Sequence, residues 1–139
     1  MRSEVASRRP SSTPSIVLLD HWIATLQAGG QAGAHAAAIG RFAAQLATLR
    51  QMSFAVTARL AQGGSPVVEA ALVKDIGTMF EQFIPAFVAD AIAADPAALP
   101  DEQLLRTAAY VTQVAPTYSL CGGTREILRG RIARGLGLR

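Results

Sequence analysis

Glycine and proline are concentrated at a few points of this sequence, and the segments between them are long and rich in Ala, Leu, Ile and Val. Such segments favour helices, because short strands would need turn residues at closer and more regular intervals. The chain has 139 residues, the size of one domain, and its hydrophobic content of 50% is enough to build a core. The sequence therefore predicts a single all-α domain.

The first two predicted helices each end at a pair of glycines. Apolar residues recur at helical spacing over Ser15–Gln27 before Gly29-Gly30, and a longer pattern over Ile39–Leu60 stops at Gly63-Gly64. The apolar side of the longer helix is formed by Ile39, Phe42, Leu46, Leu49, Val56 and Leu60. Both segments are expected to turn this side toward the core.

The third predicted helix is unusual because it contains a proline. Ser65 is expected to be its N-cap, with Pro66 at the first helical position and the end near Ala94. Pro85 lacks a backbone N–H, so we expect the helix to kink or divide near Glu81 into two stacked segments. Three-four spacing predicts that its core-facing side consists of Val68, Leu72, Ile76, Met79, Phe83 and Phe87.

The same helix has apolar side chains on more than one side. These residues include Val67, Leu72, Val73, Phe80, Ile84 and Val88. A small bundle buries only part of such a surface, and a remaining apolar patch usually marks an interface. We therefore expect self-association, or pairing with another chain, through this helix. The aromatic cluster Phe80, Phe83 and Phe87 is interpreted as packing or oligomer contact rather than a cofactor site.

Two shorter helices are predicted after the Asp95-Pro96 and Leu99-Pro100 loop. Asp101 is a plausible N-cap for the first, which Pro116 should terminate. Its apolar residues are Leu104, Leu105, Ala108, Val111 and Ala115. After Cys121-Gly122-Gly123, Thr124 should cap the last helix. Because short loops favour antiparallel neighbours, we expect residues 15–139 to form a four- to five-helix antiparallel bundle.

Charge and cysteine content exclude several classes of protein. The net charge is +3 and the pI about 9.8, but the arginines lie mostly at the two ends and form no stripe interleaved with aromatics, which argues against a dedicated nucleic-acid reader. The single Cys121 excludes an intramolecular disulfide and a cysteine-rich zinc site, which favours the cytoplasm. No uninterrupted apolar run reaches the ~20 residues of a membrane span.

The N-terminal residues and the two histidines carry no predicted site. Residues 1–14 contain arginines without the apolar core of a signal peptide, so they are interpreted as a flexible basic tail or a displaced start. His21, next to Asp20, and His35 lack the spacing of a helical metal-ligand pair. No metal site is expected, and a nucleophilic role for Cys121 is disfavoured because no histidine is near it in sequence.

The segment from Gly122 to Arg129, GGTREILR, is the one motif that points to chemistry. Two glycines allow another group to approach the backbone, and the helix beginning at Thr124 presents free N–H groups and the positive end of its dipole. Such a turn can hold an anion or a polar edge of a cofactor. On these residues alone, an ordinary turn between helices is the favoured interpretation.

The tail CGGTREILRGRIARGLGLR resembles the C-terminal signature of acyl-CoA dehydrogenases, in which a GGT-x-E-I-x-R pattern opens the final helix. The segment from Glu69 to Gln82, with Lys74, is similar to the family's preceding long helix. The resemblance implies a C-terminal helical domain that binds FAD together with a β domain and a neighbouring subunit. It also implies flavin-dependent α,β-dehydrogenation of an acyl-CoA thioester, with Gly123, Thr124 and Glu126 at the FAD-contacting positions.

The sequence departs from the family at the position of the catalytic base. Gly122 stands where many relatives have the catalytic glutamate, so no catalytic residue is assigned, and the segment that would form the β domain is missing. The chain alone is therefore expected neither to be active nor to retain FAD. Three functions stay open: part of an acyl-CoA dehydrogenase, a non-catalytic helical assembly subunit of such a complex, or a basic helical module that binds nucleic acid or anionic surfaces through its arginine-rich ends.

Overall fold

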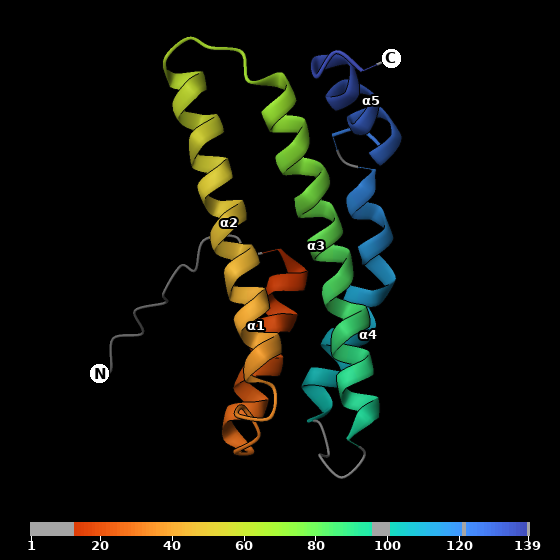
Figure 1. Cartoon of the computed structure of the whole chain (residues 1–139). Coiled ribbons are helices and arrows are strands. Elements are labelled where there is room, and N and C mark those ends of the chain that lie inside the picture. Colours follow the sequence, from red (N-terminus) through yellow and green to blue (C-terminus); the bar gives the residue numbers. More distant parts are fainter. Residues whose placement is uncertain (1–12, 96–100, 121, 139) are drawn as a thin grey trace, which may run out of the picture.

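The computed structural model describes residues 13–95, 101–120 and 122–138. Within these ranges the chain forms helices and no strands, which confirms the predicted all-α class. The elements are α1 (Pro14–Ala28), α2 (Ala36–Ala61), α3 (Val67–Ala94), α4 (Glu102–Val114), the 3-10 helix η1 (Ala115–Ser119) and α5 (Arg125–Gly135). Helices α1 to α4 alternate in direction, whereas α5 follows η1 and extends further in the direction in which α4 runs (Figure 1).

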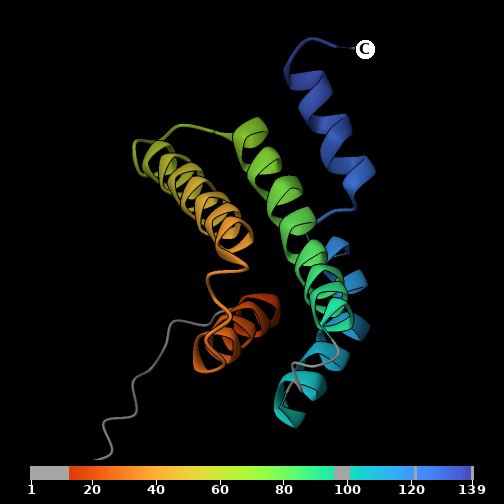
Figure 2. The same cartoon turned by 60° about the horizontal axis from the view of Figure 1, so that its bottom comes forward.

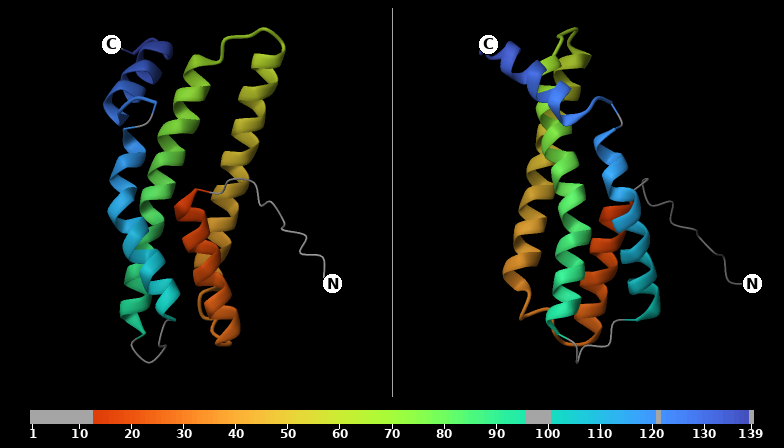
Figure 3. Two further views of the ribbon diagram at one scale, coloured as in Figure 1. Left: turned by 180° about the vertical axis from the view of Figure 1, so that it is seen from behind. Right: turned by 90° about the vertical axis from the view of Figure 1, so that its right-hand side faces the viewer.

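The bundle has two layers at one end only. Helices α2 and α3 form a long hairpin, and α1 and α4 lie together on one side of its lower half (Figure 3). Because α1 has 15 residues and α2 and α3 have 26 and 28, α1 covers only part of the hairpin. Helix α5 packs against the N-terminal half of α3 instead, at the opposite end from α4 (Figure 2).

The core lies where the two layers meet. Its buried members are Leu18, Leu19, Trp22, Leu26, Phe42, Phe80, Ile84, Val88, Leu104, Ala108 and Val111. Phe42 contacts three rings of α3, including Phe87 at 5.0 Å between ring centroids and Phe80 at 5.9 Å. The aromatic residues of α3 therefore pack against α2, which agrees with the interpretation of this cluster as packing, although Phe83 also remains exposed.

The predicted core-facing side of α3 is wrong. The buried residues of this helix are Ala71, Asp75, Thr78, Phe80, Ile84, Pro85 and Val88. Four of the predicted residues are exposed, namely Leu72, Ile76, Met79 and Phe83, and only Val68 and Phe87 are half-buried. Because α3 is apolar around most of its circumference, helical periodicity could not identify the side that α1, α4 and η1 cover.

Pro85 does not divide α3, which is a second correction. The helix is continuous over Val67–Ala94 with Pro85 inside it. Since Pro85 has no N–H, the carbonyl of Glu81 has lost its helical partner. The hydroxyl of Ser15, which is fully buried at the start of α1, donates a hydrogen bond to that carbonyl at 2.8 Å. A side chain from another helix thus replaces the missing backbone donor.

The helix ends agree with the predicted signals to within a few residues. The Asp101 carboxylate caps α4 by accepting from the Leu104 N–H at 2.6 Å, as predicted. Helix α3 begins one residue later than expected: Pro66 is the N-cap and Ser65 makes no side-chain cap. The α-helix α4 ends at Val114, but the chain continues past Pro116 as η1, because a 3-10 turn tolerates its missing donor.

The predicted boundary between the tail and the first helix differs from the structure by one residue. Pro14, predicted to belong to the tail, is the first residue of α1, and residues 1–12 lie outside the described residues.

In the part of the chain that the structure describes, α3 is the one helix long and apolar enough to cross a membrane by length and composition alone. A single such helix is weak evidence, and it is consistent with the expected absence of a span.

Candidate functional site

The predicted cofactor residues lie at the turn between η1 and α5. Gly122 and Gly123 have φ values of 82° and 111°, in the left-handed region that favours glycine. Thr124 is the N-cap of α5, as predicted, with extended backbone (φ −66°, ψ 162°). Its hydroxyl caps no helix N–H. The glycines are therefore explained by the tight turn itself.

Glu126 is an exposed acidic residue in the first turn of α5. Hydrogen bonds from its own backbone N–H and from the Thr124 hydroxyl hold the pKa of the exposed Glu126 carboxyl below its usual value. This carboxylate is therefore ionised at neutral pH and stands where an anion would otherwise meet the helix dipole. The turn thus suits a group that donates hydrogen bonds to a carboxylate better than it suits a phosphate.

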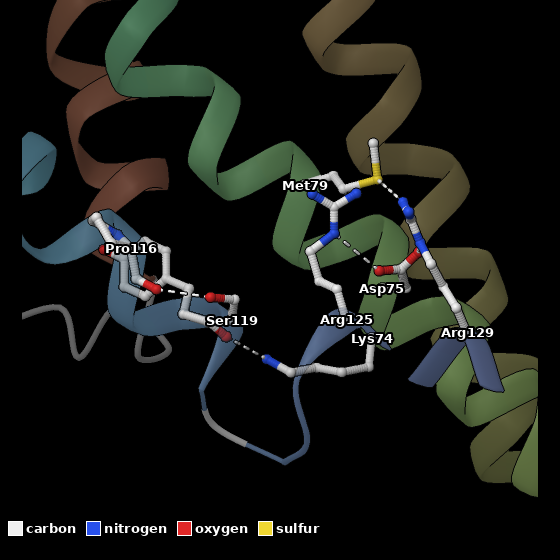
Figure 4. Close-up of polar contacts among 8 residues, drawn as sticks. Lys74, Asp75, Met79, Pro116, Ser119, Arg125 and Arg129 are labelled. Carbon is white, nitrogen blue, oxygen red and sulfur yellow. Dashed lines mark hydrogen bonds and ion pairs between the residues drawn. The ribbon is translucent and has the colours of Figure 1, made fainter. Parts of the chain in front are cut away.

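One buried carboxylate on α3 forms ion pairs with two arginines at the start of α5. Asp75, only 7% exposed, lies 3.3 Å from Nε of Arg125 and 3.3 Å from Nε of Arg129 (Figure 4). Arg129 also contacts the sulfur of Met79 at 3.8 Å. Because Asp75 is shared between two guanidinium groups, it fixes the position of α5 on α3.

A second set of contacts holds η1 on α3. Lys74 Nζ donates to the carbonyl of Tyr118 at 3.3 Å, and Gln82 Nε2 donates to the carbonyl of Ala115 at 3.1 Å (Figure 4 shows the lysine). Lys74, which the resemblance singled out, therefore has a positioning role in this structure. Together with Asp75 it sets the place of the Gly122-Gly123 turn.

The histidines have ordinary structural environments. His21 Nε2 lies 3.3 Å from the Asp101 carboxylate, and the His35 ring packs edge-on against Trp22 with centroids 5.3 Å apart. Across the described residues no group of three or more His, Cys, Asp or Glu is arranged to hold a metal ion. Cys121 lies outside the described residues, so its predicted role stays a prediction.

An exposed apolar strip on α3 is the feature that sequence reasoning assigned to the core. The exposed fractions are 38% for Leu72, 39% for Ile76, 44% for Met79 and 55% for Phe83. Beside the strip, a groove of about 540 Å³ runs between α2 and α3 and is lined in part by Leu49, Met52, Ile76, Met79 and Phe83. A second groove of about 300 Å³, lined by Phe42, Phe83 and Phe87 among others, continues it.

The strip and the grooves together form the α3 face, defined by Leu72, Ile76, Met79 and Phe83 and the α2 side chains that border them. It belongs to the side of the α2–α3 hairpin that faces away from α1 and α4, and the ribbons of α2 and α3 lie uncovered on that side in Figure 1. The abundance of apolar residues around α3 signalled that some would stay exposed, but not which ones.

Comparison with known proteins adds no assignment: no protein-family model matches the chain, and no curated protein or solved structure is detectably similar to it.

Proposed function

We propose that this chain is a non-catalytic helical assembly subunit of an acyl-CoA dehydrogenase-like complex. The observation that carries the proposal is the α3 face, on which four large apolar side chains stay 38% to 55% exposed beside a groove of about 540 Å³. Contiguous apolar surface of this kind typically marks a protein interface. The resemblance of the α5 start to the dehydrogenase signature names the kind of complex.

The chemistry of the α5 start favours assembly over catalysis. Gly122 has no side chain to accept a proton, and Asp75 is committed to Arg125 and Arg129. Glu126 is a weak base because its hydrogen bonds lower its pKa. The start of α5 therefore supplies no group that would abstract a proton from an acyl-CoA substrate.

A second candidate is that the chain contributes contacts to an FAD site as the C-terminal part of a dehydrogenase. It is favoured by the exposed Glu126 carboxylate next to Thr124 and Gly123, which would accept hydrogen bonds from hydroxyl groups of the cofactor. FAD would supply the hydride acceptor. The three residues lie outside the grooves of the α3 face, so flavin binding and assembly would use different parts of the surface.

Flavin content separates these functions. The purified single chain is expected to retain no FAD, because one helix terminus makes too few contacts to offset the ordering of a large flexible cofactor. Co-expression with each acyl-CoA dehydrogenase-like flavoprotein of the same genome should yield a stable complex with one of them. A flavin absorption band at full occupancy in the single chain would contradict the assembly proposal, and failure to join any of these flavoproteins would remove its link to dehydrogenases.

A further inference from the structure

We infer that the end of the molecule formed by the tip of the α2–α3 hairpin and the C-terminal end of α5 binds the surface of an anionic lipid bilayer. This inference goes beyond the proposed assembly function, because it concerns a surface other than the α3 face. Four exposed aliphatic side chains define this tip surface, namely Leu60 (58% exposed), Val67 (54%), Leu136 (65%) and Leu138 (60%).

Helix α5 brings two of these leucines to the hairpin tip, although they follow it by about 70 residues in sequence. Figure 3 shows the tip of the hairpin and the C-terminal end of α5 at the same end of the molecule. Their backbones pack closely, because a Cβ added at Gly135 would lie only 2.1 Å from Cγ2 of Val68. The four aliphatic side chains therefore belong to one surface.

The exposed leucines of α5 are carried by an ordered turn. Gly137, with φ 75°, lies in the left-handed region, and its N–H donates to the Arg134 carbonyl at 3.1 Å. The Leu138 N–H donates to the Ala133 carbonyl at 2.8 Å, which completes a Schellman motif at the end of α5. Helix α2 ends in the same way at Gly63, with φ 78°. Both turns are thus fixed by their own backbone hydrogen bonds.

Arginines accompany the aliphatic residues of the tip surface, and acids are few. Residues 59–69 and 130–138 contain Arg59, Arg131, Arg134 and one acid, Glu69, which leaves a net charge of +2. Glu69 pairs with Arg59. Arg131 and Arg134 are exposed, and within the described residues no carboxylate pairs with either of them. Guanidinium groups bind lipid phosphates, while aliphatic side chains beside them enter the boundary between headgroups and acyl chains.

Shape and residue type favour a lipid surface over other partners. None of the four aliphatic residues lines the five grooves of about 300 to 800 Å³ between the helices. They project from helix ends, so each can enter a fluid bilayer separately, whereas a folded protein partner needs a complementary surface. Residues 59–69 and 130–138 also contain no aromatic ring on which the bases of single-stranded nucleic acid could stack.

Matched arginine substitutions test the electrostatic part of the inference. The full chain is expected to sediment with phosphatidylglycerol vesicles and not with phosphatidylcholine vesicles. Each arginine at an anionic surface strengthens binding about fivefold, which corresponds to about 1 kcal/mol. The double variant Arg131→Gln/Arg134→Gln should therefore bind phosphatidylglycerol about 25-fold more weakly. The control Arg41→Gln/Arg50→Gln removes the same charge from exposed positions of α2 outside the tip surface and should change binding little.

A fluorescent label tests whether the leucines enter the bilayer, in a Cys121→Ser background that removes the native thiol. An environment-sensitive fluorophore on Leu138→Cys should shift its emission to the blue when phosphatidylglycerol vesicles are added. The same fluorophore on Leu105→Cys should show no shift, because Leu105 is 45% exposed on α4, away from the tip surface. Helical circular dichroism should be the same for all these variants.

Several outcomes would overturn the inference. These are no binding to phosphatidylglycerol vesicles, equal weakening by the two arginine double variants, and a blue shift at Leu105→Cys without one at Leu138→Cys. Binding to poly(U) RNA that depends on Arg131 and Arg134, without binding to vesicles, would assign the surface to nucleic acid instead. A chain that binds vesicles but joins no dehydrogenase-like flavoprotein would leave this inference standing and remove the proposed function alone.

Discussion

Replacing Ser15 by alanine tests how α3 stays continuous across Pro85. The Ser15 hydroxyl is fully buried and donates to the Glu81 carbonyl at 2.8 Å, the carbonyl whose helical partner Pro85 cannot supply. Alanine removes the donor with little change in volume. The part-buried carbonyl would then lie beside a methyl group, so the substitution isolates one hydrogen bond between α1 and α3.

The expected loss of stability in Ser15→Ala follows from the Glu81 carbonyl, which is left without a hydrogen-bond donor. A buried acceptor without a partner costs about 1–3 kcal/mol, while the better helix propensity of alanine returns up to about 0.5 kcal/mol. We therefore expect Ser15→Ala to lower the free energy of unfolding by about 1–2 kcal/mol. Ser53→Ala is the matched control, because Ser53 is an exposed serine within α2 and should change stability little.

A double-mutant cycle with Pro85→Ala assigns the effect to the missing N–H. Alanine at position 85 restores a backbone donor for the Glu81 carbonyl, so Ser15→Ala should then cost less, with a coupling of about 1 kcal/mol. Urea unfolding followed by circular dichroism, at one fixed protein concentration because the chain is expected to associate, measures all four proteins. Equal costs of Ser15→Ala in both backgrounds would refute the reasoning.

Two other predictions concern α5 and α4. Gly135→Ala should destabilise the contact of α5 with α3, because the added Cβ would lie 2.1 Å from Cγ2 of Val68. Gly130→Ala should instead stabilise α5 by about 0.5–1 kcal/mol, because no atom lies within 4 Å of the added Cβ. Urea unfolding measures both effects. The Leu104 N–H lowers the pKa of the Asp101 carboxyl from its usual 3.8. The ionised Asp101 carboxylate therefore stabilises the fold above pH 3.8, and this stabilisation is lost as the pH falls through the lower folded pKa. Thermal unfolding should accordingly show a smaller loss of stability below pH 3.8 for Asp101→Ala than for wild type.

The helices themselves were predictable because their signals are local. Gly63 at positive φ ends α2, and Asp101 caps α4 through its own third neighbour, Leu104. Thr124 likewise occupies the N-cap of α5. Each of these features depends on residues within a few positions of one another, and such patterns are readable from sequence.

The features that sequence reasoning missed depend on contacts between distant residues. Nothing near Pro85 indicates that Ser15, 66 residues before Glu81, would replace its missing donor. Asp75 is likewise paired with arginines 50 and 54 positions away. The exposed side of α3 was misassigned for a related reason, since only the positions of α1, α4 and α5 decide which apolar residues they cover.

The resemblance to the acyl-CoA dehydrogenase signature rests on residue types at matching positions and not on contacts between them. It singled out Thr124 and Glu126, which interact at the start of α5, where the Thr124 hydroxyl contributes to the lowered pKa of the Glu126 carboxyl. It also singled out Lys74, which binds the Tyr118 carbonyl next to the same turn. These contacts account for the residues within one chain, and their proposed contact with FAD stays a prediction for a complex.

The unequal lengths of α1 and the α2–α3 hairpin imply a gradient of local stability along the molecule. Toward Ala61, α2 has only Met52 and Val56 half-buried after Arg50, and an exposed ion pair between Arg59 and Glu69 adds little. Amide hydrogens there should exchange through local fraying of the hairpin tip, while those near Phe42 exchange only when the whole domain opens. A partner that covers this end would therefore slow amide exchange most at the hairpin tip.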